Sequence, residues 1–116
     1  MTKLGGNVRI TIDRKLRSDL RAVMEGVLRC EQSSPRPDID VYRLGTGSLG
    51  AYLVDTAEAL PAAELQKAPW LEFIVEDLAA TEQGLARLGM APIDYHDKAH
   101  NYYQAPGGIV FRLASA

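Results

Sequence analysis

The sequence lacks several features that would assign it at once to a broad class of proteins. Its 116 residues contain one cysteine, Cys30, so an intrachain disulfide is impossible, which is compatible with a reducing compartment. No apolar run approaches the length that spans a bilayer, and the N-terminal stretch MTKLGGNVRI has no apolar signal core. We therefore expect a cytoplasmic protein that makes no use of membranes.

The sequence also lacks a strong excess of charge of either sign. Its 13 basic and 15 acidic residues give a formal net charge of -2. This balance offers no basic surface for nucleic acid, so nucleic acid is not an expected partner. Hydrophobic residues make up 47% of the chain, which is enough to bury a core. We expect residues 1–116 to form a single domain.

Alternating and helical patterns of apolar residues predict an α+β fold. Residues 7–13 alternate apolar and polar side chains, as a half-buried strand does. Asp13 is placed to cap a helix predicted over residues 15–28. The stretch EQSSPRPD contains two prolines and reads as a loop over residues 31–38, followed by strands at residues 39–45 and 48–54 joined by a Gly-Thr-Gly turn.

The second half of the chain repeats this order. Residues 70–77 alternate as a strand, and Asp77 is placed to cap the helix that follows. Gly89 stands where a left-handed residue is expected to end that helix, and Pro61 is placed to open a short helical turn in the preceding connector. Further strand segments are predicted within residues 91–97, 101–108 and 109–115.

The chain therefore reads as a tandem repeat of a strand, a helix and about three strands. VRITID matches LEFIVE, and VYRLGTGSLGAYLV matches NYYQAPGGIVFRLA. We predict tandem βαβββ modules at residues 7–55 and 70–114, joined by a connector at residues 56–69. The alternative is one ferredoxin-like α+β sheet with irregular additions.

The stretch FIVEDLAATEQGLARLGM, followed by NYYQAPGGIVFRLAS, resembles the vicinal oxygen chelate superfamily. This group includes glyoxalase I, bleomycin-resistance proteins, fosfomycin-resistance enzymes and extradiol dioxygenases. The shared pattern is a strand, an Asp-Leu helix start, a Leu-Gly helix end and a Pro-Gly-Gly turn into the last strand. The first half matches by pattern only. The resemblance implies curved mixed sheets around a concave cleft, with each helix on the convex side, and it implies a homodimer.

The resemblance also indicates where the metal-dependent members place their ligands. Those members use His or Gln and then Glu, from the first and last strands of each unit. The corresponding positions in this sequence are Asn7, Tyr52, Trp70 and Arg112. None of these is a histidine or a carboxylate, and Arg112 would repel a dication. We therefore expect no metal and no other cofactor, which argues against glyoxalase, dioxygenase and thiol-transferase chemistry.

Strand alternation predicts which side chains face the cleft and which face the helices. Trp70 offers a flat wall for stacking on the cleft side. Glu72 is expected to pair with Arg9 or Arg112, because a carboxylate in a partly closed site needs a partner. The remaining guanidinium can then receive an anionic or carbonyl-bearing ligand. The cleft face is predicted to hold Asn7, Arg9, Thr11, Tyr52, Trp70, Glu72, Ile74, Val110 and Arg112, and the helix side Val8, Ile10, Ile12, Leu71, Phe73, Val75, Ile109, Phe111 and Leu113.

These observations favour a metal-independent protein that binds a small organic molecule. Its predicted ligand-binding residues are Asn7, Arg9, Tyr52, Trp70, Glu72 and Arg112. One alternative is a lyase or isomerase that uses Glu72, Tyr52 or His96 as acid or base, with His96 paired to Asp97 at the rim of the cleft. Another is a structural or regulatory dimer whose cleft is filled, with an Arg–Glu–Arg network at the subunit interface.

His96 and His100 lie four residues apart in the stretch YHDKAHN. This spacing binds metal well on a helix, but here it falls in a predicted loop. A metal site needs three or four converging ligands, so we interpret the stretch as a solvated turn.

Overall fold

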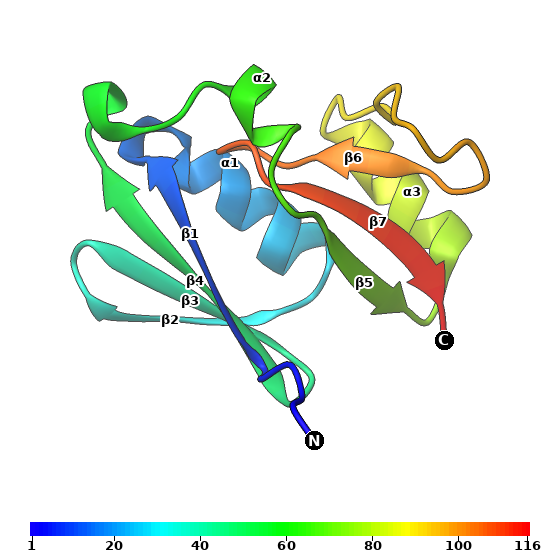
Figure 1. The fold of residues 1–116 in the computed structure, drawn as a ribbon, viewed down its shortest axis with the longest axis horizontal. Coiled ribbons are helices and arrows are strands. Elements are labelled where there is room, and N and C mark those ends of the chain that lie inside the picture. Colours follow the sequence, from blue (N-terminus) through cyan, green and yellow to red (C-terminus); the bar gives the residue numbers. More distant parts are fainter. The chain divides into compact units, whose positions relative to one another are not determined.

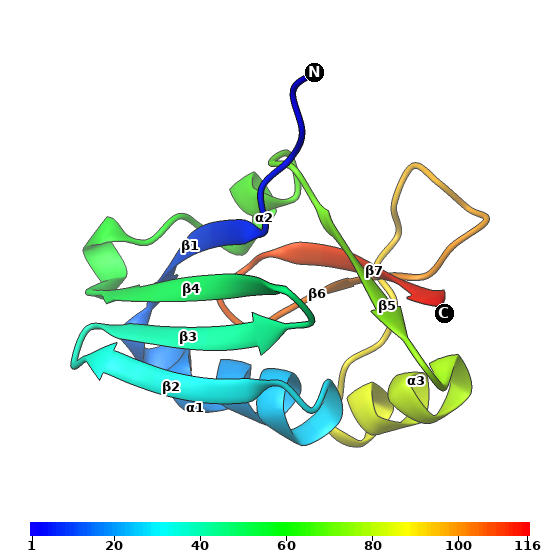
Figure 2. The ribbon, with the colours of Figure 1, turned by 90° about the horizontal axis from the view of Figure 1, so that it is seen from below.

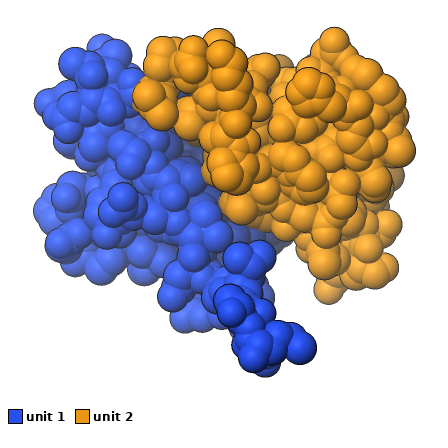
Figure 3. All heavy atoms as spheres, in the orientation of Figure 1, with its two compact units in different colours: residues 1–59 blue, residues 60–116 orange.

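The computed structural model describes all of residues 1–116, and the chain divides into two compact units. Unit 1 comprises residues 1–59 and unit 2 comprises residues 60–116 (Figure 3). The division falls within the segment 56–69 that the sequence suggests as a connector. None of the helices combines the length and the apolar character needed to cross a bilayer.

Unit 1 contains a four-stranded sheet in the order β1-β4-β3-β2 (Figures 1 and 2). Its strands are β1 (Asn7–Asp13), β2 (Glu31–Arg36), β3 (Ile39–Leu44) and β4 (Gly47–Val54). β1 runs parallel to β4, whereas β4, β3 and β2 are antiparallel to their neighbours. With the helical segment between β1 and β2, this is one βαβββ module, as the sequence predicts.

The β3–β4 hairpin depends on glycine at its turn. Gly45 has a φ of 62°, which L side chains rarely adopt. A Cβ on Gly47 would lie 2.6 Å from the carbonyl oxygen of Gly6. The lack of a side chain here lets the segment before β1 approach β4, and the N–H of Ser48 donates to that Gly6 carbonyl at 2.7 Å.

The prediction of a loop over residues 31–38 is wrong, because most of this stretch forms β2. Ser33 lies opposite Val41, and the register then shifts so that Arg36 lies opposite Ile39. Pro35 stands within this irregular part of β2. A residue without an N–H is tolerated there because β2 is at the edge of the sheet. Hydrogen bonds with β3 make the strand, and local composition does not reveal them.

The helix predicted over residues 15–28 is present but is not uniform. It comprises η1 (Arg14–Leu16), a 3₁₀ turn; α1 (Arg17–Arg21); and η2 (Ala22–Val27), a π-helical turn. The carboxylate of Asp13 accepts a hydrogen bond from the N–H of Lys15 at 3.0 Å, which confirms the predicted cap. The wider turn at the end brings both Val23 and Met24 into the core, each 1% exposed.

A buried charge network joins this helical segment to the sheet. The carboxylate of Asp40 on β3 is 1% exposed. Arg17 donates to it from Nη2 at 2.7 Å and from Nε at 2.9 Å, and Arg21 donates at 3.2 Å. The hydroxyl of Ser34 on β2 donates at 2.7 Å. Burial raises the pKa of Asp40, but hydrogen bonds from Arg17 and Ser34 outweigh it, so the net pKa lies below the ordinary value.

Unit 2 contains a three-stranded sheet in the order β5-β7-β6. β5 (Leu71–Val75) is parallel to β7 (Val110–Ser115), and β6 (Tyr102–Gln104) is antiparallel to β7. The strand predicted within residues 91–97 is reduced to a single bridge between Ile93 and Tyr102. Unit 2 thus has the element order of a second βαβββ module, but the strand that follows the helix consists of a single bridged residue pair.

The helix of unit 2 begins and ends as the sequence predicts. α3 (Leu78–Arg87) is capped by Asp77, whose carboxylate accepts the N–H of Ala80 at 3.0 Å. Gly89 has a φ of 79° and ends the helix. Two short turns precede unit 2's sheet: η3 (Thr56–Glu58), and α2 (Ala62–Leu65), which follows Pro61 as predicted.

Alternation predicts the helix side correctly in the middle of the strands but not at two positions near their ends. Ile12, Phe73, Phe111 and Leu113 are all at most 8% exposed. Val8, the second residue of β1, is 37% exposed. Val110, predicted on the open face, is fully buried. It lies opposite Gln104, whose amide donates to the Ala62 carbonyl at 2.7 Å and fastens α2 beside this end of the sheet.

Candidate functional site

The six predicted ligand-binding residues fall into two groups, one in each unit. Asn7, Arg9 and Tyr52 belong to unit 1, whereas Trp70, Glu72 and Arg112 belong to unit 2. Within each sheet, the strand positions of these residues have the parity opposite to that of the buried helix-facing residues. The prediction that they share an open sheet face therefore holds within each unit.

In unit 1 we call the open face of the sheet the Arg9 face. Cross-strand pairs define it: Asn7 lies opposite Ser48, Arg9 opposite Gly50, and Thr11 opposite Tyr52. β3 continues the same rows, with Arg43 opposite Ser48 and Val41 opposite Gly50. Gly50 carries no side chain, so the surface is low between Arg9 and Val41.

Arg9 rests on an aromatic ring and has no acidic partner. Its guanidinium carbon lies 4.9 Å from the centroid of the Tyr52 ring. Arg36 is farther from that ring, at 6.0 Å, and pairs with Asp38 at 3.6 Å. Neither Arg9 nor Arg43 forms a salt bridge within the chain. The donors of two guanidinium groups on this face therefore remain available to an anion.

A pocket of about 340 Å³ lies at one end of the Arg9 face. The hydroxyl of Ser48 donates to the side-chain oxygen of Asn7 at 3.0 Å, which leaves the Asn7 amide donors free. The volume suits a small organic molecule. The pocket is lined by Asn7, Glu31, Gln32, Ser33, Val41, Arg43, Thr46, Gly47 and Ser48.

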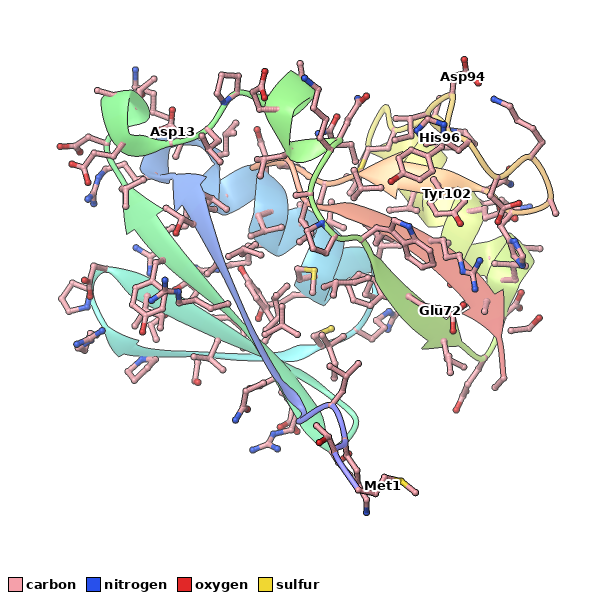
Figure 4. The ribbon with its side chains drawn as sticks, viewed as in Figure 1. Met1, Asp13, Glu72, Asp94, His96 and Tyr102 are labelled. Carbon is pink, nitrogen blue, oxygen red and sulfur yellow. The ribbon has the colours of Figure 1, made fainter.

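In unit 2 the site residues form what we call the His100 cluster: Glu72, Asp97, His100, Tyr102 and Arg112. Arg112 is central. Its Nε donates to Glu72 at 2.7 Å, and its Nη1 lies 3.3 Å from the Tyr102 hydroxyl and 3.4 Å from Asp97 Oδ2. Glu72 extends from β5 and Tyr102 from β6 (Figure 4). Glu72 thus pairs with Arg112, one of its two predicted partners, and this hydrogen bond is the main cause that raises the pKa of Arg112.

Trp70 supplies the aromatic wall of the His100 cluster. The guanidinium carbon of Arg112 lies 4.7 Å from the Trp70 ring centroid. Tyr102 meets the indole edge to face, with centroids 5.3 Å apart, and Tyr95 stacks on Tyr102 at 4.6 Å. Trp70 is still 36% exposed, so part of the indole is open to a ligand.

The predicted pairing of His96 with Asp97 is wrong, because Asp97 pairs with His100. The Nδ1 of His100 lies 2.7 Å from Asp97 Oδ2. Asp97 Oδ1 accepts the N–H of Ala99 at 2.8 Å, and this tight turn sets His100 beside the carboxylate. These hydrogen bonds, from Ala99 first and then His100, lower the pKa of Asp97 to about 2. His96 (labelled in Figure 4) is exposed, and its ring centroid lies 5.2 Å from that of Tyr95.

The residues at the positions of the metal ligands do not suit a metal ion. Trp70 and Arg112 contact each other through cation and ring, and neither can donate an electron pair to a cation. No three His, Cys, Asp or Glu side chains gather closely enough to hold a metal. Cys30 is buried, and burial raises its pKa to about 11, so its thiol is protonated.

Comparison with known proteins finds the likeness in structure and not in sequence. No protein-family model and no curated protein sequence matches the chain. A solved structure described as a glyoxalase family protein from Bacillus anthracis superposes with a TM-score of 0.71 at 15% identity, covering 99% of this chain and 96% of its own.

Two other solved structures extend the likeness. A glyoxalase/bleomycin resistance protein from Albidiferax ferrireducens gives a TM-score of 0.68 at 12% identity, covering 98% of this chain and 99% of its own. The fosfomycin resistance protein FosX from Listeria monocytogenes gives 0.69 at 10% identity, covering 100% and 95%. At these identities the likeness establishes the fold and not a reaction. The predicted resemblance is confirmed at that level: the chain has the glyoxalase/bleomycin-resistance fold of the vicinal oxygen chelate proteins.

Proposed function

We propose that this chain is a metal-independent binding protein for a small anionic or carbonyl-bearing organic molecule. The observation that carries the proposal is Arg9, held at 4.9 Å over the Tyr52 ring without any acidic partner. A guanidinium fixed in this way keeps its planar set of donors for a ligand.

The neighbouring residues fit the same kind of ligand. Arg43 adds a second guanidinium two strands away, and Asn7 adds amide donors beside the pocket of about 340 Å³. Gly50 carries no side chain, and the side-chain atom nearest to the position of its missing Cβ is Ile39 Cδ1, at 3.7 Å. An aromatic carboxylate can accept hydrogen bonds from these guanidinium groups, and Glu31, which lies opposite Arg43 and also lines the pocket, favours Arg9 as its partner.

The first test is to titrate the protein with benzoate and with benzamide, its neutral counterpart, by calorimetry. Arg9→Gln is expected to weaken benzoate binding about tenfold or more, because a hydrogen bond to a charged group contributes about 1.5–3 kcal/mol. Arg14→Gln is the matched control, since Arg14 pairs with Asp55 at 3.0 Å outside the Arg9 face. Equal loss of benzoate affinity in both variants would contradict the proposal, as would the absence of binding by both compounds. Equal affinity for benzoate and benzamide would show that Arg9 binds the carbonyl group and not the negative charge.

The metal-independent part has its own test. Affinity for benzoate is expected to be the same in EDTA and with added Mn²⁺ or Zn²⁺, because Glu31 is the one carboxylate that lines the pocket and no imidazole accompanies it, which is too few ligands for a metal. A rise in benzoate affinity on adding metal would contradict metal independence and would favour a metal-dependent enzyme instead.

We also propose that the protein forms a homodimer. β5 is an edge strand of its sheet, and its residue Ile74 is 67% exposed, so this edge offers apolar surface to a second copy. Sedimentation equilibrium measures the mass directly, and Ile74→Lys is expected to shift it toward the monomer. A monomeric wild type would remove this proposal without touching the Arg9 face.

A further inference from the structure

Unit 2 contains a histidine–aspartate pair, His100 and Asp97, whose proposed role does not depend on the Arg9 face. His100 is held by the carboxylate of Asp97, with Nδ1 and Oδ2 2.7 Å apart, and its side chain is 43% exposed. Its other ring nitrogen, Nε2, makes no hydrogen bond within the chain. An imidazole oriented by a carboxylate through one nitrogen presents the other nitrogen to a ligand.

Asp97 is itself fixed in place. Its Oδ1 accepts the N–H of Ala99 at 2.8 Å, and its Oδ2 accepts the hydroxyl of Tyr102 at 3.0 Å. Because Tyr102 is 2% exposed on β6, the carboxylate is tied to the sheet and not only to its own turn. An ionised carboxylate can only accept, so it selects the tautomer of His100 with the proton on Nδ1. The lone pair of His100 is therefore on Nε2.

Arg112 completes the surroundings of the imidazole. Its Nη1 lies 3.4 Å from Nδ1 of His100, but two donors cannot bond, so this contact places a positive charge beside the ring. Its Nη2 makes no hydrogen bond within the chain, and its guanidinium lies over Trp70. A negative charge that forms near His100 therefore meets a free N–H donor and a fixed cation.

We propose that His100 is a general base and Asp97 its positioning residue, acting on a small weak acid that binds beside Arg112 and the exposed part of Trp70. Nε2 of His100 takes the proton: an N–H bond forms, the bond between that proton and the substrate breaks, and the electron pair stays on the substrate. Asp97 balances the charge of the imidazolium, and Arg112 faces the new anion. No other reactant is needed.

The other titratable groups nearby are already engaged or too far along the loop. Glu72 is held by Arg112 at 2.7 Å, so it does not serve as the base. Lys98 and Asp94 pair with each other at the exposed side of the loop. Glu82 on α3 accepts from Asn101 at 2.6 Å and from the Tyr103 hydroxyl at 3.2 Å. His96 forms no salt bridge or side-chain hydrogen bond within the chain, so no carboxylate fixes its tautomer and it serves as an internal control.

The tautomer test uses the two histidines of one protein. A long-range proton–nitrogen NMR correlation spectrum, recorded where both rings are neutral, is expected to show the proton of His100 on Nδ1. His96 should show the proton on Nε2, the form that a free imidazole side chain prefers. In Asp97→Asn, His100 should change to the pattern of His96. If the two histidines already match in the wild type, the positioning role of Asp97 is wrong.

The base itself is tested with para-nitrophenol, a flat weak acid whose anion is yellow. The dye is mixed with the protein at a pH where most free dye is protonated, and the absorbance of the anion is measured. Wild type is expected to raise the anion fraction, and His96→Gln to keep that rise. His100→Asn should lose it, although its amide can still donate to Asp97 and hold the loop. Circular dichroism checks that each variant is folded.

The outcomes separate the two parts of the inference. No rise with the wild-type protein overturns the ligand class. A rise that survives in His100→Asn overturns the base. Benzoate binding by the Arg9 face should be unchanged in His100→Asn, so failure here is distinguishable from failure of the proposed function.

Discussion

The two arginine–carboxylate networks of this protein use the same chemistry for different ends. In unit 1, Arg17 and Arg21 meet a carboxylate that is 1% exposed beneath a helix. In unit 2, Arg112 meets Glu72 and Asp97 on an open sheet face, where the side chains of these two acids are 36% and 33% exposed. Because the first network is buried, it holds the helix against the sheet. Because the second is exposed, a ligand can reach it.

This difference follows from the cost of removing charge from water. A buried carboxylate must be saturated with donors, and Asp40 receives them from Arg17, Arg21, Ser34 and Gln32. The acids of the His100 cluster are solvated on one side, so they need fewer donors from the chain to offset their charge. A network that keeps one side open to solvent is the one that a ligand can reach.

The largest effect is expected from the buried network. Asp40→Asn leaves Arg17 and Arg21 without their carboxylate and should lower the free energy of unfolding by about 3 kcal/mol. Urea denaturation followed by circular dichroism measures it. Asp97→Asn is the matched change in the open network and should cost much less. Equal costs would break the distinction between the two networks.

The pH dependence of stability is expected to be the next largest effect. The folded pKa of Asp40 lies below the ordinary value, so its contribution is present above the unfolded pKa of about 3.9 and is lost as pH falls through the folded pKa. The unfolding free energy should be level near neutral pH and fall below about pH 4. Much of this fall should be absent in Asp40→Asn. If wild type and variant follow parallel curves, Asp40 is not the group responsible.

The smallest effect is expected at the open face. Glu72→Gln breaks a partly exposed ion pair with Arg112 and should leave the free energy of unfolding within about 1 kcal/mol of wild type. The emission of Trp70, the one tryptophan of the chain, should nevertheless change, because Arg112 lies 4.7 Å above its ring. Unchanged emission together with a large loss of stability would place Glu72 in the structural class with Asp40.

Local signals made most of the fold predictable. The caps at Asp13 and Asp77 and the stop at Gly89 each depend on residues within one turn of the chain, so the sequence shows them directly. β2 could not be found in this way. Its residues are poor strand formers, and its pairing with β3 is a property of the sheet.

The sequence predicts which side chains of the candidate site share a sheet face, but it does not predict which of them pair with each other. Alternation places Arg9 and Tyr52, or Glu72 and Arg112, on a common face, because parity along a strand is fixed. The partner of Asp97 depends on the path of a loop, which favours His100 over the adjacent His96. The signal in the sequence was the spacing Asp-Lys-Ala-His: an aspartate that caps its own turn brings the third residue after it back toward the carboxylate.

Pro35 has a consequence beyond the strand it interrupts. The outer edge of a sheet exposes backbone donors and acceptors that can pair with another chain and seed aggregation. On β2, Pro35 removes one backbone N–H donor and lies where the register shifts between Ser33 and Arg36. The edge therefore lacks a regular row of backbone hydrogen-bonding groups for another protein chain. Pro35 therefore makes β2 difficult to predict from the sequence and also makes its outer edge less able to pair with other chains.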